Sequence, residues 1–147
     1  MNIVKKEKLL LWEPLTENPF SRLEREMLFV KMVYEVDFIL VFKDYETSFE
    51  YTFTYKKPEE RPYPILTFRS CEEMARPDIE SLIGLLENPP MYNPTFYKVE
   101  NSDFLAWYDN NFSARATLQP NVEHHLFITS DFFIDVLSEI QPVVTIK

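Results

Sequence analysis

The sequence predicts an α+β fold: a single domain over residues 1–147, with a mainly antiparallel sheet in its first half and about three to four helices packed on it. Apolar residues alternate with period two through residues 28–42 and 47–56, which is typical of half-buried strands. Beyond residue 65, short strand-like runs alternate with runs of helical spacing. The length of 147 residues suits one domain, and a hydrophobic content of 46% supplies its core.

The first half begins with a helix-start signal and continues as strands. Asn18 followed by Pro19 is typical of a helix cap, so a short helix over residues 20–26 is expected. Every even position from 28 to 42 is apolar, which favours one long strand or two collinear strands. A helical spacing that reaches residue 34 competes with this interpretation. Residues 43–46 are expected to form a hairpin connection into the strand at 47–56.

The strand at 47–56 carries aromatic rings on alternate positions, which are Phe49, Tyr51, Phe53 and Tyr55. Such a stripe suits either a platform for base stacking or one wall of a core. A stacking platform needs flanking basic groups, whereas only Lys56 and Lys57 lie near and Glu50 is within the strand. Each buried ring removes on the order of 150–250 Å² from water. We therefore expect the stripe to face the core.

The second half is predicted to alternate strands with helices. A strand at 65–68 precedes Ser70 and Glu73, which have capping-box spacing, and a helix over 78–87 that Pro77 begins. A strand at 95–99 leads to a helix that starts at Ser102 and carries apolar residues as far as position 112. A strand at 125–129 leads to Ser130, which is expected to cap a helix up to residue 140. Residues 143–147 close the chain as a short strand.

Charge is unevenly distributed along the chain. Residues 1–69 hold 12 acidic and 11 basic side chains, whereas residues 70–147 hold 12 acidic and only 4 basic ones. An acidic surface disfavours nucleic acid and anionic membranes, both of which attract basic proteins, and it suits a basic protein partner. The residues expected to bind such a partner, which include two aromatic residues of the helix from 102, are Asp103, Trp107, Tyr108, Asp109, Glu123, Asp131, Asp135 and Glu139.

The composition excludes several classes of function. Gly84 is the only glycine, so the phosphate-binding loops of dinucleotide and P-loop proteins, which need several glycines, are excluded. The apolar run near the N-terminus is too short for a secretory signal, and no run approaches the roughly 20 residues of a membrane span. A single cysteine excludes an intramolecular disulfide framework. We expect a cytoplasmic protein without a cofactor.

Few residues indicate chemistry. His124 and His125 are adjacent, so in a strand they point to opposite faces and do not chelate one ion together. Asp131 and Asp135 have the spacing of helix-borne metal ligands, but they lie opposite the apolar stripe of their predicted helix, where a solvated face is expected. Cys71 would be a nucleophile only beside a base, and a lone cysteine suits a buried position. We therefore predict neither a catalytic residue nor a metal site.

Two segments, NPTFYKVENSDFLAWYDNN and HHLFITSDFFIDVLSEIQPVV, resemble the C-terminal half of small uncharacterised bacterial proteins associated with immunity genes beside polymorphic toxins. The resemblance covers the chain from residue 93 onward and brings no assigned functional residues with it. It implies a compact cytoplasmic protein that occludes a cognate toxin domain. Where the toxin is basic, an acidic surface would speed the encounter.

These observations predict a non-enzymatic protein-interaction domain, most concretely an immunity-type inhibitor of a toxin. Two alternatives stay open. One is a small metal-dependent or hydrolytic enzyme that uses His124 or His125 with acidic residues of the last predicted helix. The other is a self-associating structural protein of phage origin, in which an exposed sheet edge joins the copies into a homo-oligomer.

Overall fold

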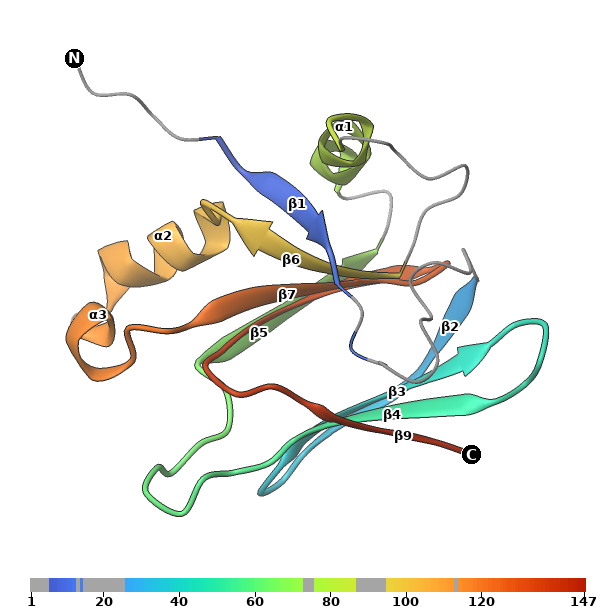
Figure 1. Ribbon diagram of the computed structural model, residues 1–147, viewed down its shortest axis with the longest axis horizontal. Helices are drawn as coiled ribbons and strands as arrows, with labels where there is room; N and C mark the ends of the chain where they lie inside the picture. The colour runs from blue at the N-terminus through green and yellow to red at the C-terminus, as the bar shows by residue number, and fades with distance from the viewer. Residues whose placement is uncertain (1–5, 13, 15–25, 73–75, 87–94, 113) are drawn as a thin grey trace.

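Two antiparallel β-sheets form the body of the protein (Figure 1). The computed structural model describes residues 6–12, 14, 26–72, 76–86, 95–112 and 114–147. Among these residues, one sheet has five strands in the order β1-β6-β7-β8-β5, and the other has four in the order β2-β3-β4-β9. The chain passes between the sheets after β1, after β4 and after β8. Each sheet therefore combines strands that are distant in sequence.

The five-stranded sheet is made of β1 (Lys8–Leu11), β5 (Thr67–Glu72), β6 (Phe96–Glu100), β7 (Glu123–Ile128) and β8 (Phe132–Ser138). Strands β7 and β8 form a hairpin that pairs from Glu123 opposite Ser138 to Ile128 opposite Phe133. Because side chains alternate along a strand, this sheet has an inner face toward the second sheet and an outer face away from it. Neighbouring residues of β7 therefore lie on opposite faces of the sheet.

The four-stranded sheet is made of β2 (Met27–Tyr34), β3 (Phe38–Asp44), β4 (Glu50–Tyr55) and β9 (Val143–Ile146). Strands β2, β3 and β4 form a meander, and the C-terminal strand β9 pairs with β4. Asp44 fixes the connection between β3 and β4, because its carboxylate accepts the amide protons of Glu46 and Thr47 at 2.8 and 3.2 Å. The predicted hairpin is therefore present, but its connection is residues 45–49 and not 43–46.

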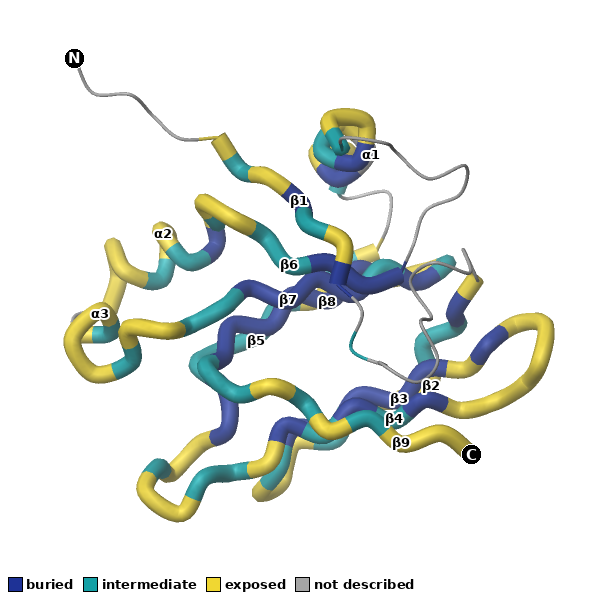
Figure 2. Tube along the Cα trace, in the orientation of Figure 1, coloured by how far each residue is buried: buried dark blue, intermediate teal, exposed yellow. Residues whose placement is uncertain are grey.

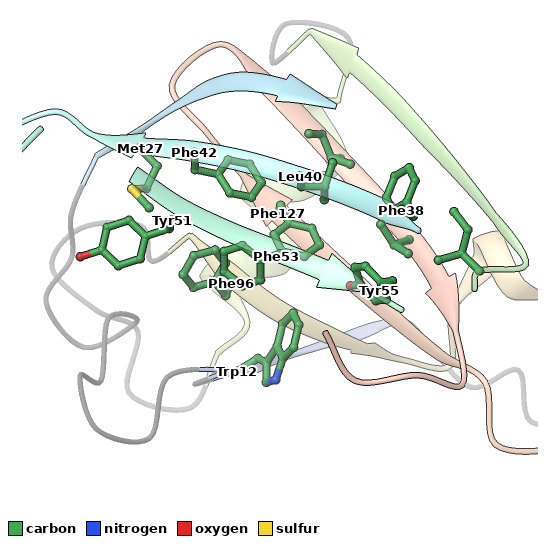
Figure 3. Close-up of a cluster of buried hydrophobic side chains, with 13 residues drawn as sticks. Trp12, Met27, Phe38, Leu40, Phe42, Tyr51, Phe53, Tyr55, Phe96 and Phe127 are labelled. Atoms are coloured by element: carbon green, nitrogen blue, oxygen red, sulfur yellow. The ribbon is translucent and has the colours of Figure 1, made fainter. Parts of the chain in front are cut away.

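Aromatic rings fill the space between the two sheets (Figure 3). Tyr51, Phe53 and Tyr55 of β4 are fully buried there, which confirms the core interpretation for three members of the aromatic stripe. The prediction is wrong for Phe49, which is 51% exposed because it precedes β4 in the hairpin. In Figure 2 the buried parts of the chain follow the two sheets, as this core requires.

Three described helices lie outside this core (Figures 1 and 2). Helix α1 (Pro77–Gly84) packs Ile79 and Ile83 against the outer face of the five-stranded sheet, where they join a second apolar cluster. Helix α2 (Asp103–Asn111) follows β6 and buries only Phe104, and helix α3 (Arg115–Leu118) buries no residue. No described helix is both long enough and apolar enough to span a membrane.

The predicted α+β fold class is wrong, because most described elements are strands in two sheets rather than three to four helices packed on one sheet. The largest single error is the helix predicted to end at residue 140, where the structure has strand β8. β8 is buried on both faces: Ile134 and Val136 enter the core between the sheets, whereas Phe133 joins the outer cluster. A strand buried on both faces does not alternate, so its apolar residues also matched helical spacing.

Several other predicted elements have different bounds in the structure. Residues 28–42 form two strands, β2 and β3, that turn back on each other and are not collinear. Strand β5 begins later than the predicted 65–68 strand and includes Ser70, so Ser70 does not cap a helix; Arg76 occupies the cap position of α1. Most of the predicted helix over 20–26 lies outside the described residues. The predicted strands at 47–56, 95–99, 125–129 and 143–147 correspond to β4, β6, β7 and β9.

Candidate functional site

The candidate site begins at the turn between β6 and α2. Asn101 adopts a left-handed conformation with φ of 53°, which asparagine tolerates better than most residues, and it redirects the chain at the end of β6. Ser102 then caps α2 as predicted, because its Oγ accepts the amide proton of Leu105 at 3.0 Å. The first turn of α2 therefore starts beside the beginning of β7.

A chain of hydrogen bonds crosses the outer face of the five-stranded sheet. Ser102 Oγ lies 2.7 Å from His124 Nδ1, and His124 Nε2 lies 2.6 Å from Asp135 Oδ1. The other carboxylate oxygen, Asp135 Oδ2, accepts from Arg69 Nε and from Arg76 Nη1, each at 2.9 Å. His124 and Asp135 are buried. The sheet thus aligns a hydroxyl, an imidazole and a carboxylate.

The ionisation of Asp135 fixes the protons along this line. Burial by itself would raise the pKa of Asp135, but the hydrogen bonds from His124 and from Arg69 hold that pKa at about 2. The ionised carboxylate accepts, so Nε2 of His124 carries a proton. In the neutral imidazole Nδ1 is then the acceptor, and it receives the hydroxyl proton of Ser102.

The inner face of β7 holds a second histidine in a different setting. His125 Nδ1 lies 2.7 Å from the hydroxyl of Tyr55, and the imidazole stacks on Trp12 with ring centroids 4.3 Å apart. His125 Nε2 is 3.5 Å from Glu123 Oε1, which is too long for a good hydrogen bond. Burial lowers the pKa of His125, so this imidazole is neutral at pH 7.

A cleft opens where β6 ends and β7 begins, beside α2. Its volume is about 640 Å³, and part of its wall is aliphatic, from Leu10, Val99, Leu105 and Ala106. Its polar lining includes Lys98, Glu100, Ser102, Asp103, Glu123 and His124. The hydrogen-bonded line on the outer face therefore reaches this cleft through Ser102 and His124.

Two carboxylates beside the cleft, those of Glu123 and Asp109, are ionised at neutral pH. The neighbouring side chains of His125 and Lys98 lower the pKa of Glu123 to about 2, and the ammonium of Lys98 is 2.8 Å from its carboxylate. Arg115 likewise binds Asp109 and lowers the pKa of that residue. The cleft lining holds more acidic than basic side chains, which makes it unfavourable for anions.

Helix α2 presents aromatic rings to solvent next to the cleft. Phe104 is buried beneath the guanidinium of Arg69, which lies 4.2 Å from the ring centroid. Trp107 stacks on Phe104 and is 51% exposed, and Phe112, just beyond the helix, is 51% exposed as well. Tyr108 contacts Phe112 with a centroid distance of 4.7 Å. This aromatic surface is formed by Trp107, Tyr108 and Phe112.

The residues predicted to bind a partner are only partly brought together. Asp103, Trp107, Tyr108 and Asp109 share α2, and Glu123 lies across the cleft from this helix. Asp131 is exposed in the turn between β7 and β8, at the far end of β7.

The other two predicted partner-binding residues require correction. Asp135 is fully buried in the line with His124, and Glu139 binds Arg61 at 2.6 Å. The acidic helix face of Asp131, Asp135 and Glu139 does not exist, because the segment is strand β8. A strand sends Asp135 into the outer face of the sheet, where arginine and histidine bind it.

The two histidines lie on β7 and Cys71 lies on β5. The two histidines point to opposite faces of β7, as their adjacency in a strand predicts. Within the described part of the chain, no group of three His, Cys, Asp or Glu side chains is arranged to hold a metal ion. Cys71 lies on β5 and is partly buried against the outer apolar cluster. The sequence indicates Ser102 only as a helix cap and carries no signal for Arg69 and Arg76, because Arg69 reaches Asp135 through the pairing of β5 with β8 and Arg76 reaches it from the start of α1.

The chain has no match among protein-family models, curated proteins or solved structures. The resemblance to immunity-type proteins therefore stays a prediction.

Proposed function

We propose that this protein is an interaction domain that binds a protein partner through the aromatic surface of α2, and that an immunity-type inhibitor of a basic toxin is its most concrete form. The observation that carries the proposal is the half-exposure of Trp107 and Phe112 in contact with each other. Large aromatic side chains are enriched at protein interfaces and among the residues that dominate binding energy. Neither residue is needed to fill the core between the sheets.

The charge beside this surface supports a basic partner. Asp103 is exposed in the first turn of α2, and Glu100 and Glu123 border the neighbouring cleft. Exposed carboxylates attract a basic surface over several ångströms and raise the association rate, an effect that salt weakens. A basic side chain of the partner would find carboxylates around the cleft and an aliphatic wall inside it.

The experiment measures binding to the protein encoded by the reading frame next to this gene, expressed as an inactive variant if it is toxic. Trp107→Ala should weaken the dissociation constant by at least about tenfold, as expected for a central interface aromatic. Tyr63→Ala is the matched control, because Tyr63 is 66% exposed in the connection between β4 and β5 and is not part of α2.

Equal affinities for wild type and Trp107→Ala would contradict the proposal. Sedimentation across a concentration series separates a different outcome, in which α2 binds a second copy of this chain. In that case Trp107→Ala would lower the fraction of dimer, and the neighbouring gene product would not compete with dimer formation.

A further inference from the structure

We propose that Ser102 is the nucleophile of a site that hydrolyses small acyl esters, with His124 as its general base and Asp135 as the residue that positions His124. This inference is independent of partner binding through α2. It is carried by the unbroken line from Ser102 Oγ through both imidazole nitrogens to a buried carboxylate, with steps of 2.7 and 2.6 Å. Such a line is recognised by geometry and roles rather than by sequence position.

The imidazole of His124 is held in a single orientation. Asp135 accepts from Nε2, and the ring of Phe104 packs edge-on against the imidazole with centroids 5.7 Å apart. Nδ1 therefore faces the hydroxyl of Ser102 and no other described side chain. Compared with the usual serine hydrolases, the two nitrogens exchange roles, since here the base is Nδ1. Proton transfer needs only a lone pair within hydrogen-bond distance, which Nδ1 provides.

A backbone donor for a developing oxyanion lies next to the nucleophile. The amide of Leu105 donates to Ser102 Oγ at 3.0 Å, so it fixes the position of the nucleophile and does not bind the substrate oxyanion. The amide of Asp103, directly after Ser102, donates to the carboxylate of Glu7 at 2.8 Å in an exposed position. An oxyanion of the substrate can take the place of that carboxylate, because the amide already binds one anionic oxygen.

The proposed reaction is ordinary acyl transfer to serine. Oγ bonds to the ester carbonyl carbon while its proton passes to Nδ1 of His124. The carbon–oxygen bond to the leaving group then breaks, and the leaving alkoxide takes the proton from Nδ1. Water attacks the acyl-serine with Nδ1 again as the base, the bond between Oγ and the acyl carbon breaks, and Oγ regains the proton. The sum is ester plus water giving acid plus alcohol.

The cleft defines the class of substrate. Its aliphatic wall suits a short acyl chain, and its carboxylates favour neutral or cationic esters over anionic ones. Arg69 and Arg76 share the charge of Asp135, so less of that charge stabilises the imidazolium that forms during attack. We therefore expect slow turnover with p-nitrophenyl acetate, with an initial burst from the acyl-serine.

The test labels the folded protein with a fluorophosphonate and locates the adduct by mass spectrometry. We expect one equivalent on Ser102 and none after heat denaturation. Ser102→Asn should abolish the adduct but keep α2 capped, because asparagine also caps helices. His124→Gln should slow labelling by at least about a hundredfold, the usual scale of general-base catalysis. Ser70→Ala, which removes an exposed serine of β5, should label at the wild-type rate.

The positioning role of Asp135 is tested by measuring its separate effects on kcat and KM. Asp135→Asn offers an amide proton to Nε2 and favours the wrong tautomer, so kcat should fall by at least about a hundredfold with KM unchanged. A general loss of structure would change both constants and the circular dichroism spectrum. The proposal is overturned if folded protein gives no adduct on Ser102, if Ser70 is labelled equally fast, or if folded His124→Gln reacts at the wild-type rate.

Discussion

The two faces of β7 give adjacent histidines different surroundings from the same kinds of groups. His125, on the inner face, has a tyrosine hydroxyl, a glutamate and a stacked tryptophan, and it is sealed inside the sandwich. His124, on the outer face, has a serine hydroxyl and an aspartate, and it reaches a cleft. The inner histidine is buried between the sheets, whereas the outer one borders the cleft beside α2. What differs is the covering layer: a complete second sheet on one side and separate helices on the other.

The largest effect on stability is expected when an aromatic side chain is removed from the core between the sheets. Phe53 is fully buried and contacts Phe96 and Phe127 at centroid distances of 4.9 and 5.3 Å. Phe53→Ala should lower the free energy of unfolding by about 3 to 5 kcal/mol, measured by urea denaturation. Phe49→Ala, on the exposed ring of the same stripe, should cost less than about 0.5 kcal/mol. Similar losses for both variants would show that the sandwich core is not where the structure places it.

On the outer face, stability depends on the buried carboxylate of Asp135. Asp135→Ala removes the acceptor of His124, Arg69 and Arg76 and leaves a partly buried arginine without its partner. Loss of one member of a buried ion pair costs about 3 to 5 kcal/mol, and we expect the lower end because Arg69 is accessible to water. The measurement is again urea denaturation at pH 7. A cost below about 1 kcal/mol would mean that this line contributes little to the fold.

How far the sequence predicts this arrangement depends on the element. The alternation in β4 and the cap of α2 are local patterns, so Tyr51 and Ser102 were placed correctly. β8 was not, because burial on both faces removes the alternation that marks a strand. The error concealed the site: a helix at 130–140 puts Asp135 on a solvated face, whereas the β7–β8 register brings it to His124. Arg69 reaches Asp135 from β5 and Arg76 reaches it from the start of α1. Local sequence spacing does not encode these contacts between distant residues.

Acid should first lower the stability of the protein by protonating Asp135 on the outer face. Its pKa is about 2 in the folded protein against an ordinary value of 3.8, so the ionised form is favoured by folding. This stability, about 2 kcal/mol, is present above pH 4 and is lost as the pH falls toward 2. Urea midpoints measured between pH 5 and 2 should therefore fall in wild type and fall less in Asp135→Asn. Some loss should remain in the variant, because Glu123 also has a folded pKa of about 2, below its usual 4.5.

The inner histidine should respond to a higher pH range. Burial lowers the pKa of His125 below 6.5, so the unfolded chain binds more protons there than the folded protein. The contribution of His125 is fully present above pH 6.5 and declines as the pH falls below it. His125→Phe preserves the stacking on Trp12 but leaves the Tyr55 hydroxyl without its acceptor, so it should cost about 1 to 2 kcal/mol at pH 7.5. It should also flatten the pH dependence between 7.5 and 5.5; an unchanged slope would exclude His125 as its source.

The smallest effect is expected where sequence reasoning expected a binding face. Asp131→Lys changes an exposed residue in the β7–β8 turn and should alter stability by less than about 0.5 kcal/mol. Asp135→Lys, four residues further, places a third cation beside Arg69 and Arg76 in a buried position, and we expect it to unfold the domain. On a solvated helix face the two charge reversals would be equally tolerated. In the sheet they differ, because Asp131 meets water and Asp135 meets two guanidinium groups and an imidazole. Circular dichroism melting curves of the two variants distinguish these cases, and equal melting temperatures would contradict the strand assignment of β8.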